Sequence, residues 1–152
     1  MTTSTSKTEL LDFCRKQVTL RHSKIKQTIA NIEESLFEES KSSSGDKHET
    51  GRAMLQIDRE NAGKQLFEIE KLLEILKKID IKTTSEYVRL GSLVRTDKFN
   101  YFLSLSLGTV TIENKDYRCV ALNSPIGLLI SGKKLGDGFN FNGEAQTILE
   151  VE

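Results

Sequence analysis

The stretch that decides the fold is Thr8–Glu39, TELLDFCRKQVTLRHSKIKQTIANIEESLFEE, because its apolar residues recur at helical spacing. Two interleaved rows of positions, each with a seven-residue repeat, form the alternating pattern of a coiled-coil seam. No Gly or Pro interrupts the stretch, so we expect one long helix. The first row contains Leu11, Val18, Ile25 and Ile32, and the second contains His22, Ile29 and Leu36, with His22 as its weak position.

A second stretch repeats the pattern after a polar connection, Ser42–Thr50, with the sequence SSSGDKHET. A short polar connection between two helices of similar length brings them together antiparallel. The first eighty residues, 1–80, therefore predict a coiled-coil hairpin with its tip at about residues 40–51. The seam positions of its second helix are Leu55, Ala62, Ile69 and Leu76, with Leu66 and Leu73 in the offset row.

The second half, residues 81–152, has the pattern of strands. Short runs with β-branched residues or alternating polarity, such as YFLSLSLGTVTI and QTILEV, are bounded by Gly, Asn and Asp. Between them, SPIGLLISGKK predicts a short helix that begins after Ser124-Pro125 and ends before Gly132. We therefore expect an α+β protein, in which the helical hairpin is followed by a small antiparallel β domain with one short helix.

The composition excludes several kinds of protein. Lys and Arg together number 22 and Asp and Glu also number 22, so no bulk charge drives the chain onto nucleic acid or a membrane. No run of residues approaches the length of a membrane span. Cys14 and Cys119 follow no metal-ligand spacing and are expected to be reduced structural thiols. We expect a cytoplasmic monomer.

Asp46 and Glu49 stand three positions apart in the predicted tip, and two interpretations of them stay open. In the first, Asp46 caps the second helix and Glu49 completes a capping box, which contributes about 1 kcal/mol. In the second, the two carboxylates share a Mg²⁺ ion, which favours one or two carboxylates together with waters and a phosphate. Two carboxylates are too few for a catalytic centre, so a partner would have to complete the site.

The segment Asn123–Asp137, NSPIGLLISGKKLGD, resembles the C-terminal signature of the bacterial Gre transcript-cleavage factors. The matching residues are a Ser-Pro-Ile-Gly turn, then Gly132-Lys133, then Gly136-Asp137. The flanking runs GSLVRT and AQTILEVE also resemble strands of that family, and GDKHE resembles its Gly-Asp-x-x-Glu tip. The resemblance covers nearly the whole chain and is most specific in the C-terminal segment.

The resemblance implies an FKBP-like second domain and a role in transcription elongation. It implies that the protein binds RNA polymerase, inserts its coiled coil into the secondary channel, and meets nucleic acid only within the elongation complex. It further implies that Asp46 and Glu49 help the polymerase to hold a shared Mg²⁺ and to cleave backtracked RNA, so the chain is not itself an enzyme. The polymerase-binding residues that it implies are Ser124, Pro125, Ile126, Gly127, Lys133 and Lys134.

The tip departs from the Gre pattern, which leaves open whether the protein stimulates RNA cleavage or inhibits the polymerase. Arg52 replaces an acidic residue, and Lys47 stands where the family has an apolar one. Positive charge beside the two acids weakens the sharing of Mg²⁺, which favours a non-cleaving or inhibitory channel-binding homologue as one alternative. A coiled-coil adaptor with no polymerase role is another. A prolyl isomerase is not expected, because the chain has no Trp for an aromatic-lined pocket.

Overall fold

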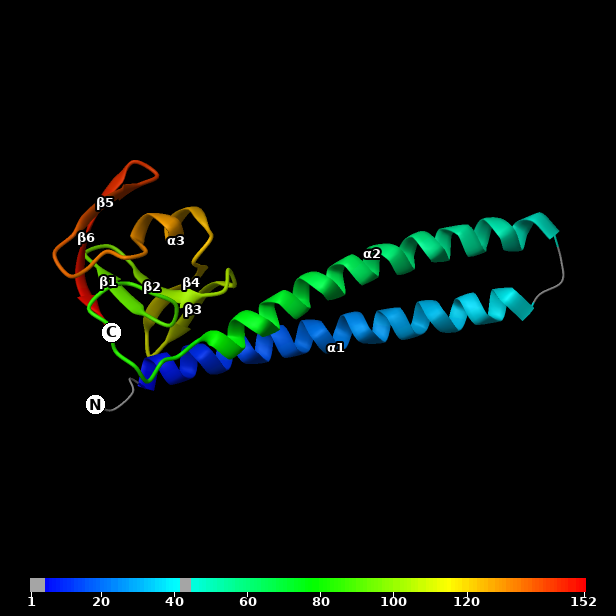
Figure 1. Cartoon of the computed structure of the whole chain (residues 1–152), viewed down its shortest axis with the longest axis horizontal. Helices are drawn as coiled ribbons and strands as arrows, with labels where there is room; N and C mark the ends of the chain where they lie inside the picture. Colours follow the sequence, from blue (N-terminus) through cyan, green and yellow to red (C-terminus); the bar gives the residue numbers. More distant parts are fainter. Residues whose placement is uncertain (1–4, 42–44) are drawn as a thin grey trace. The chain divides into compact units, whose positions relative to one another are not determined.

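The computed structural model describes residues 5–41 and 45–152, and the side chains of residues 5–41 and 50–152. The described residues form two long helices, four strands, a short helix and two further strands (Figure 1). They divide into two compact units, one of Gln17–Leu73 and one that joins Met1–Lys16 to Glu74–Glu152. Each unit is described by itself below. The sequence domains 1–80 and 81–152 stay a prediction.

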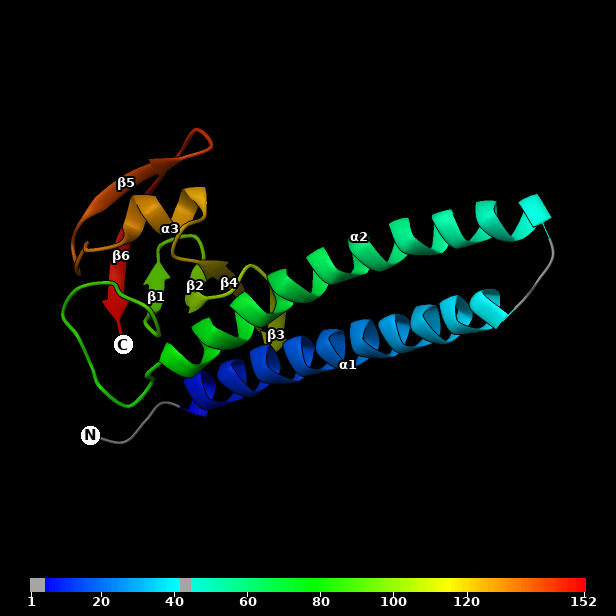
Figure 2. The same cartoon turned by 45° about the vertical axis from the view of Figure 1, so that its right-hand side comes forward.

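The first unit contains most of the helical hairpin. The helices of the hairpin are α1, Thr5–Lys41, and α2, Gly45–Lys78, and within this unit they lie side by side in both views (Figures 1 and 2). Ile25 and Ile29 of α1 are buried against Ala62 of α2, with Ile32, Leu66 and Ile69 packed around them. All six are predicted seam positions, so the prediction of a coiled-coil hairpin is confirmed.

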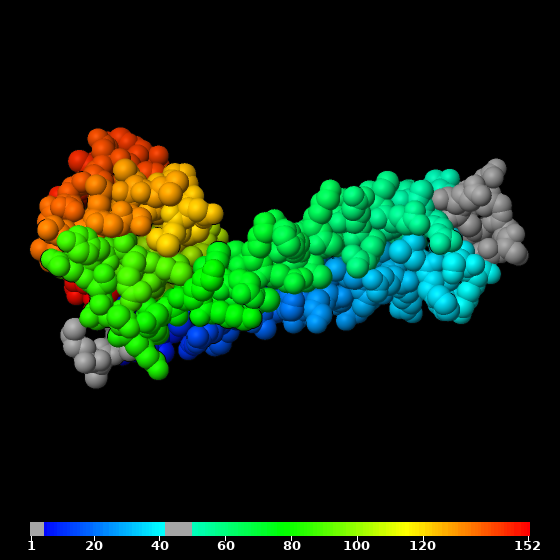
Figure 3. All heavy atoms as spheres, viewed as in Figure 1, coloured from blue at the N-terminus to red at the C-terminus, as the bar shows by residue number. Residues whose placement is uncertain are grey.

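A polar contact at the margin of the seam joins the two helices. Arg59 Nε donates a hydrogen bond to Glu33 Oε1 across the hairpin at 3.0 Å. Further along, a Cβ atom at Gly51 would lie 3.6 Å from the carboxylate of Glu39, so the Glu39 side chain of α1 reaches the backbone of α2 there. The space-filling view shows side chains of the two helices meeting along the hairpin (Figure 3).

The second unit is built on one sheet of six strands in the described chain, in the order β3-β4-β2-β1-β6-β5. Its helix, α3, spans Pro125–Ile130 and follows β4. A two-residue turn with positive φ at Glu113 and Asn114 joins β3 to β4, as tight antiparallel hairpins require. The strands are β1 Leu93–Thr96, β2 Asn100–Ser104, β3 Gly108–Ile112, β4 Lys115–Ala121, β5 Gly138–Phe141 and β6 Glu144–Val151.

The sheet is mixed, which corrects the expectation of an antiparallel sheet. β2 and β4 pair in parallel, with Tyr101 opposite Arg118 and Leu103 opposite Val120. The reason is that β4, and not β3, lies next to β2, while β3 pairs with the other side of β4 as an exposed edge strand. The prediction of a helical hairpin followed by a small β domain with one short helix is otherwise confirmed.

The hydrophobic core of this unit lies between α3 and one face of the sheet. Burial of the α3 residues Ile126 and Ile130 against this face provides most of the driving force that holds a helix of six residues in place. The buried members of this core are Val88, Val94, Tyr101, Leu103, Ile126, Ile130, Phe139 and Ile148.

The opposite face of the sheet contacts the first turns of α1. Because side chains alternate along a strand, Phe102 and Ser104 point away from the α3 core. Cys14 of α1 donates a hydrogen bond to Ser104 Oγ, and the hydroxyl of Ser6 lies 3.3 Å from that of Tyr117. The unit therefore has three layers, with α1 residues on one side of the sheet and α3 on the other. Within the described chain, neither long helix has a segment apolar enough to cross a bilayer.

Candidate functional site

Ser124 and Pro125 form the start of α3. The Ser124 Oγ accepts a hydrogen bond from Gly127 N at 3.1 Å and donates one to Ala121 O at 2.6 Å. Ser124 is thus the N-cap of the helix, and Pro125 occupies the first helical position, where its missing N–H leaves no partner unsatisfied. In the fold, both residues therefore serve to start the helix.

Ile126 and Gly127 are both buried in this unit, and the expectation that they bind a partner stays a prediction. Ile126 is 7% exposed and belongs to the α3 core. A Cβ atom at Gly127 would lie 2.0 Å from Ala121 O, so only glycine permits this close approach of α3 to the end of β4. Within the Ser-Pro-Ile-Gly motif, the structural role of these two residues is packing.

The exposed side chains of the same segment are different residues. Leu128, at 69% exposed, and Leu135, at 63%, are large apolar side chains in solvent, as is half-exposed Tyr87. Tyr87 pairs through its backbone with Lys134, next to Leu135. We call Tyr87, Leu128 and Leu135 the exposed apolar set. Sequence reasoning missed these residues, although the spacing of buried Ile126 and Ile130 places Leu128 on the other side of α3.

Lys133 and Lys134 lie in the turn that follows α3. The carbonyl of Lys133 accepts a hydrogen bond from Val88 N at 2.8 Å, and Lys134 N donates to Asp137 Oδ2 at 3.0 Å. The Val88 bond holds the turn against the segment before β1, and the Asp137 bond closes the turn itself. The Lys134 side chain is exposed and that of Lys133 is half-buried, so of the two lysines Lys134 is the better placed to meet a partner.

Asp46 and Glu49 lie in the first turn of α2, which begins at Gly45. Their side chains lie outside the described residues, so both the capping interpretation and the Mg²⁺ interpretation stay predictions. Elsewhere in the described chain, no three His, Cys, Asp or Glu side chains gather closely enough to hold a metal ion.

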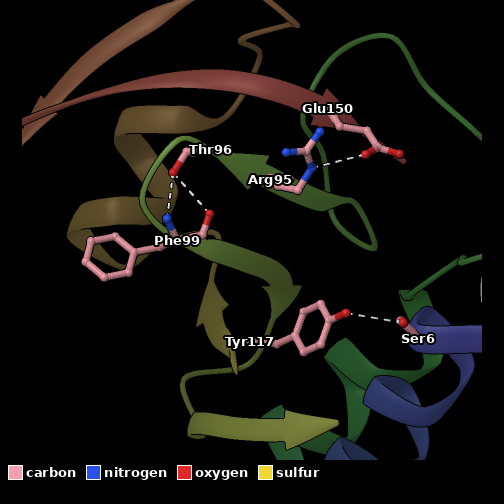
Figure 4. A network of polar contacts seen from close by, with 6 residues as sticks. All are labelled: Ser6, Arg95, Thr96, Phe99, Tyr117 and Glu150. Carbon is pink, nitrogen blue, oxygen red and sulfur yellow. Dashed lines mark hydrogen bonds and ion pairs between the residues drawn. The ribbon is translucent and has the colours of Figure 1, made fainter. Parts of the chain in front are cut away.

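A polar cavity of about 590 Å³ opens on the sheet face that contacts α1. Arg95 Nε lies 3.3 Å from Glu150 Oε2, and Tyr117 reaches the Ser6 hydroxyl of α1 (Figure 4). Ser6 faces a phenol and not an imidazole, so the cavity has no activated serine nucleophile. The residues around the cavity are Ser6, Leu93, Arg95, Asn100, Lys115, Tyr117, Glu150 and Glu152.

A turn beside this cavity is held by Thr96. The backbone N–H of Phe99 donates to Thr96 Oγ1 at 2.9 Å, as the dashed lines in Figure 4 show. The same hydroxyl lies 2.9 Å from Gln146 Oε1, which also accepts a hydrogen bond from the Tyr101 hydroxyl at 3.1 Å. Burial raises the pKa of Tyr101, which therefore stays a neutral donor. This network fixes the β1–β2 turn and is structural.

Comparison with known proteins identifies little. No protein-family model matches the chain, and no curated protein matches it. Among solved structures, the structure of the transcription factor Gfh1 is similar over 86% of this chain and 92% of that one, with 16% sequence identity and a TM-score of 0.34. At this TM-score no function can be transferred from one protein to the other. A function must therefore be inferred from the residues of the chain itself.

Proposed function

We propose that this protein is a Gre-like regulator of transcription elongation that binds RNA polymerase. In this proposal the exposed apolar set and Lys134 dock on the polymerase, and the helical hairpin enters its secondary channel. The polymerase supplies the catalysis, and the chain contributes the carboxylates of Asp46 and Glu49 to a shared Mg²⁺ ion. Nucleic acid is met only within the elongation complex.

The proposal rests on which side chains of the segment 123–137 are buried and which are exposed. Its motif residues Ile126 and Gly127 are buried, whereas Leu128 and Leu135 beside them are exposed. Exposed large apolar side chains that gather on one surface are typical of a protein-binding surface. The sequence resemblance to the Gre factors supplies the identity of the partner. The confirmed hairpin adds support, since channel insertion requires a long two-helix element.

A binding experiment separates the exposed residues from the buried ones. The double variant Leu128→Ser/Leu135→Ser alters side chains that are in solvent, so its stability should change by no more than about 0.5 kcal/mol. We expect core RNA polymerase to retain the parent protein and to lose this variant. Leu149→Ser, at a leucine 41% exposed on β6, is the matched control and should be retained. Failure of the polymerase to retain the parent chain would refute the proposal.

A cleavage assay on stalled elongation complexes tests the role of the tip. The double variant Asp46→Asn/Glu49→Gln removes both charges but keeps side chains that can hydrogen-bond at the start of α2. We expect it to bind polymerase like the parent and to lose any stimulated RNA cleavage. If it stimulates cleavage equally well, the two residues serve only as helix caps.

An inhibitory homologue is the second candidate, and the sequence of the tip favours it. Lys47 and Arg52 add positive charge near the two acids, which opposes the binding of a cation there. In the same assay, an inhibitor would lower the rate of RNA extension below that without protein and would leave backtracked RNA uncleaved. Loss of inhibition in the Leu128→Ser/Leu135→Ser variant would assign the effect to docking on the polymerase.

A further inference from the structure

The two cysteines of the chain meet in the three-layered unit although they are far apart in sequence. Cys14 lies on α1 and is 0% exposed, and Cys119 lies on β4 and is 2% exposed. Both are free thiols. The proposed transcription role uses neither of them, so their juxtaposition calls for a separate explanation.

Ser104 of β2 contacts Cys14 where α1 meets the sheet. The Cys14 Sγ–H donates to Ser104 Oγ at 3.6 Å, and Ser104 is itself 1% exposed. In the parallel pairing of β2 with β4, Cys119 lies opposite Phe102, two residues before Ser104 on the same face. The Cys14 and Cys119 side chains are close enough to perturb each other's titration.

The interaction between the two side chains makes the thiols chemically unequal. It lowers the pKa of Cys14, because once Cys14 is deprotonated the Cys119 thiol and the Ser104 hydroxyl can both donate hydrogen bonds to its sulfur. The same interaction, followed by burial, raises the pKa of Cys119, which therefore keeps its proton. Because the thiolate is the reactive form of cysteine, and because Cys14 lies beside the Ser104 hydroxyl that can stabilise a thiolate, we assign Cys14 as the nucleophile of the pair.

We propose that Cys14 and Cys119 form a redox-sensitive pair, which hydrogen peroxide converts into a disulfide that joins α1 to β4. In the first step the Cys14 thiolate attacks one peroxide oxygen, the O–O bond breaks, and a sulfenic acid and hydroxide form. In the second step the sulfur of Cys119 attacks the sulfenic sulfur, and its proton leaves with the hydroxyl group as water. Two thiols are thereby oxidised, and one peroxide is reduced to two waters.

The cross-link would act at a specific place in the fold. Cys14 belongs to the same unit as the sheet, close to Gln17, where the hairpin unit begins. In the reduced protein α1 is attached to the sheet there by packing and weak hydrogen bonds, and in the oxidised protein by a covalent bond. A disulfide that closes so long a segment of chain stabilises the fold by restricting the unfolded state. The proposal is independent of any role in transcription.

Mass spectrometry of the native full-length protein tests the proposal directly. After treatment with hydrogen peroxide and quenching, we expect the intact mass to fall by two hydrogen atoms and a digest to contain the Cys14 peptide linked to the Cys119 peptide. We also expect the unfolding midpoint of the oxidised protein to rise and to return on reduction. Because both thiols are buried, N-ethylmaleimide should modify neither in the native protein and both in urea.

Two variants and two adverse outcomes complete the test. Cys119→Ala should accumulate sulfenic acid at Cys14, detected with dimedone, whereas Cys14→Ala should react more slowly and give no linked peptide. Addition of two or three oxygen atoms to either thiol of the parent, without a linked peptide, would overturn the proposal. An unchanged intact mass after peroxide treatment of the folded protein would also overturn the proposal. Both measurements use the parent protein, so neither depends on whether a variant folds.

Discussion

The substitution Gly127→Ala tests whether the Ser-Pro-Ile-Gly motif is a packing device. The added Cβ atom would lie 2.0 Å from Ala121 O and 2.7 Å from Leu122 O. Both are backbone atoms at the end of β4, so they cannot rotate aside as a flexible side chain would. The substitution therefore forces α3 away from the strand or distorts the turn between them.

The expected loss of stability follows from three contributions. Overpacking of this kind costs about 1–3 kcal/mol. A shift of α3 also disturbs the cap formed by Ser124, whose hydroxyl contacts Ala121 O, and a lost cap costs about 1 kcal/mol. Alanine is more favourable than glycine in a helix by about 1 kcal/mol, which offsets the cap. The net loss in the free energy of unfolding is about 1–3 kcal/mol.

Urea unfolding of the parent and two variants measures this loss. Gly138→Ala is the matched control, because its Cβ would lie at an ordinary distance of 3.6 Å from Gln146 O and its φ is not in the left-handed region. We expect the control to change stability by less than about 1 kcal/mol. The reasoning fails if Gly127→Ala is as stable as the parent, or if both glycine variants lose the same amount.

Two further predictions concern single polar groups. Hydrogen bonds from Thr83 and from the backbone of Lys82 and Thr83 lower the pKa of Asp80 from 3.8 to about 2, so its contribution is present above pH 3.8 and is lost as the pH falls toward 2. For Asp80→Asn, urea unfolding between about pH 5 and pH 2 should show a smaller fall in the free energy of unfolding than for the parent. An identical pH dependence in the two proteins would contradict the prediction. Tyr101→Phe removes a buried hydroxyl that donates to Gln146 and should cost about 0.5–1.5 kcal/mol in thermal unfolding, whereas an unchanged midpoint would count against the network.

Several features of this protein could be predicted from local sequence because they depend on residues near one another. The seven-residue repeat predicted the hairpin, since Ile25 and Ile29 must share a helix face whatever surrounds them. The Ser124-Pro125 pair predicted the start of α3 for the same reason, because a cap and its helix are only a few residues apart. These features needed no knowledge of the remaining chain.

Other features depend on residues that are distant in sequence. The parallel pairing of β2 with β4 could not be predicted, because a strand pattern shows which face is buried and not which strand lies alongside. The burial of Ile126 and Gly127 could not be predicted either, because it results from packing against β4 and the sheet. Their place in a polymerase-binding surface, which the resemblance implies, stays a prediction. The sequence by itself thus determined the two-helix hairpin and the start of α3. Only the tertiary structure decided that Cys14 meets Cys119, because that contact exists only once α1 lies against the sheet.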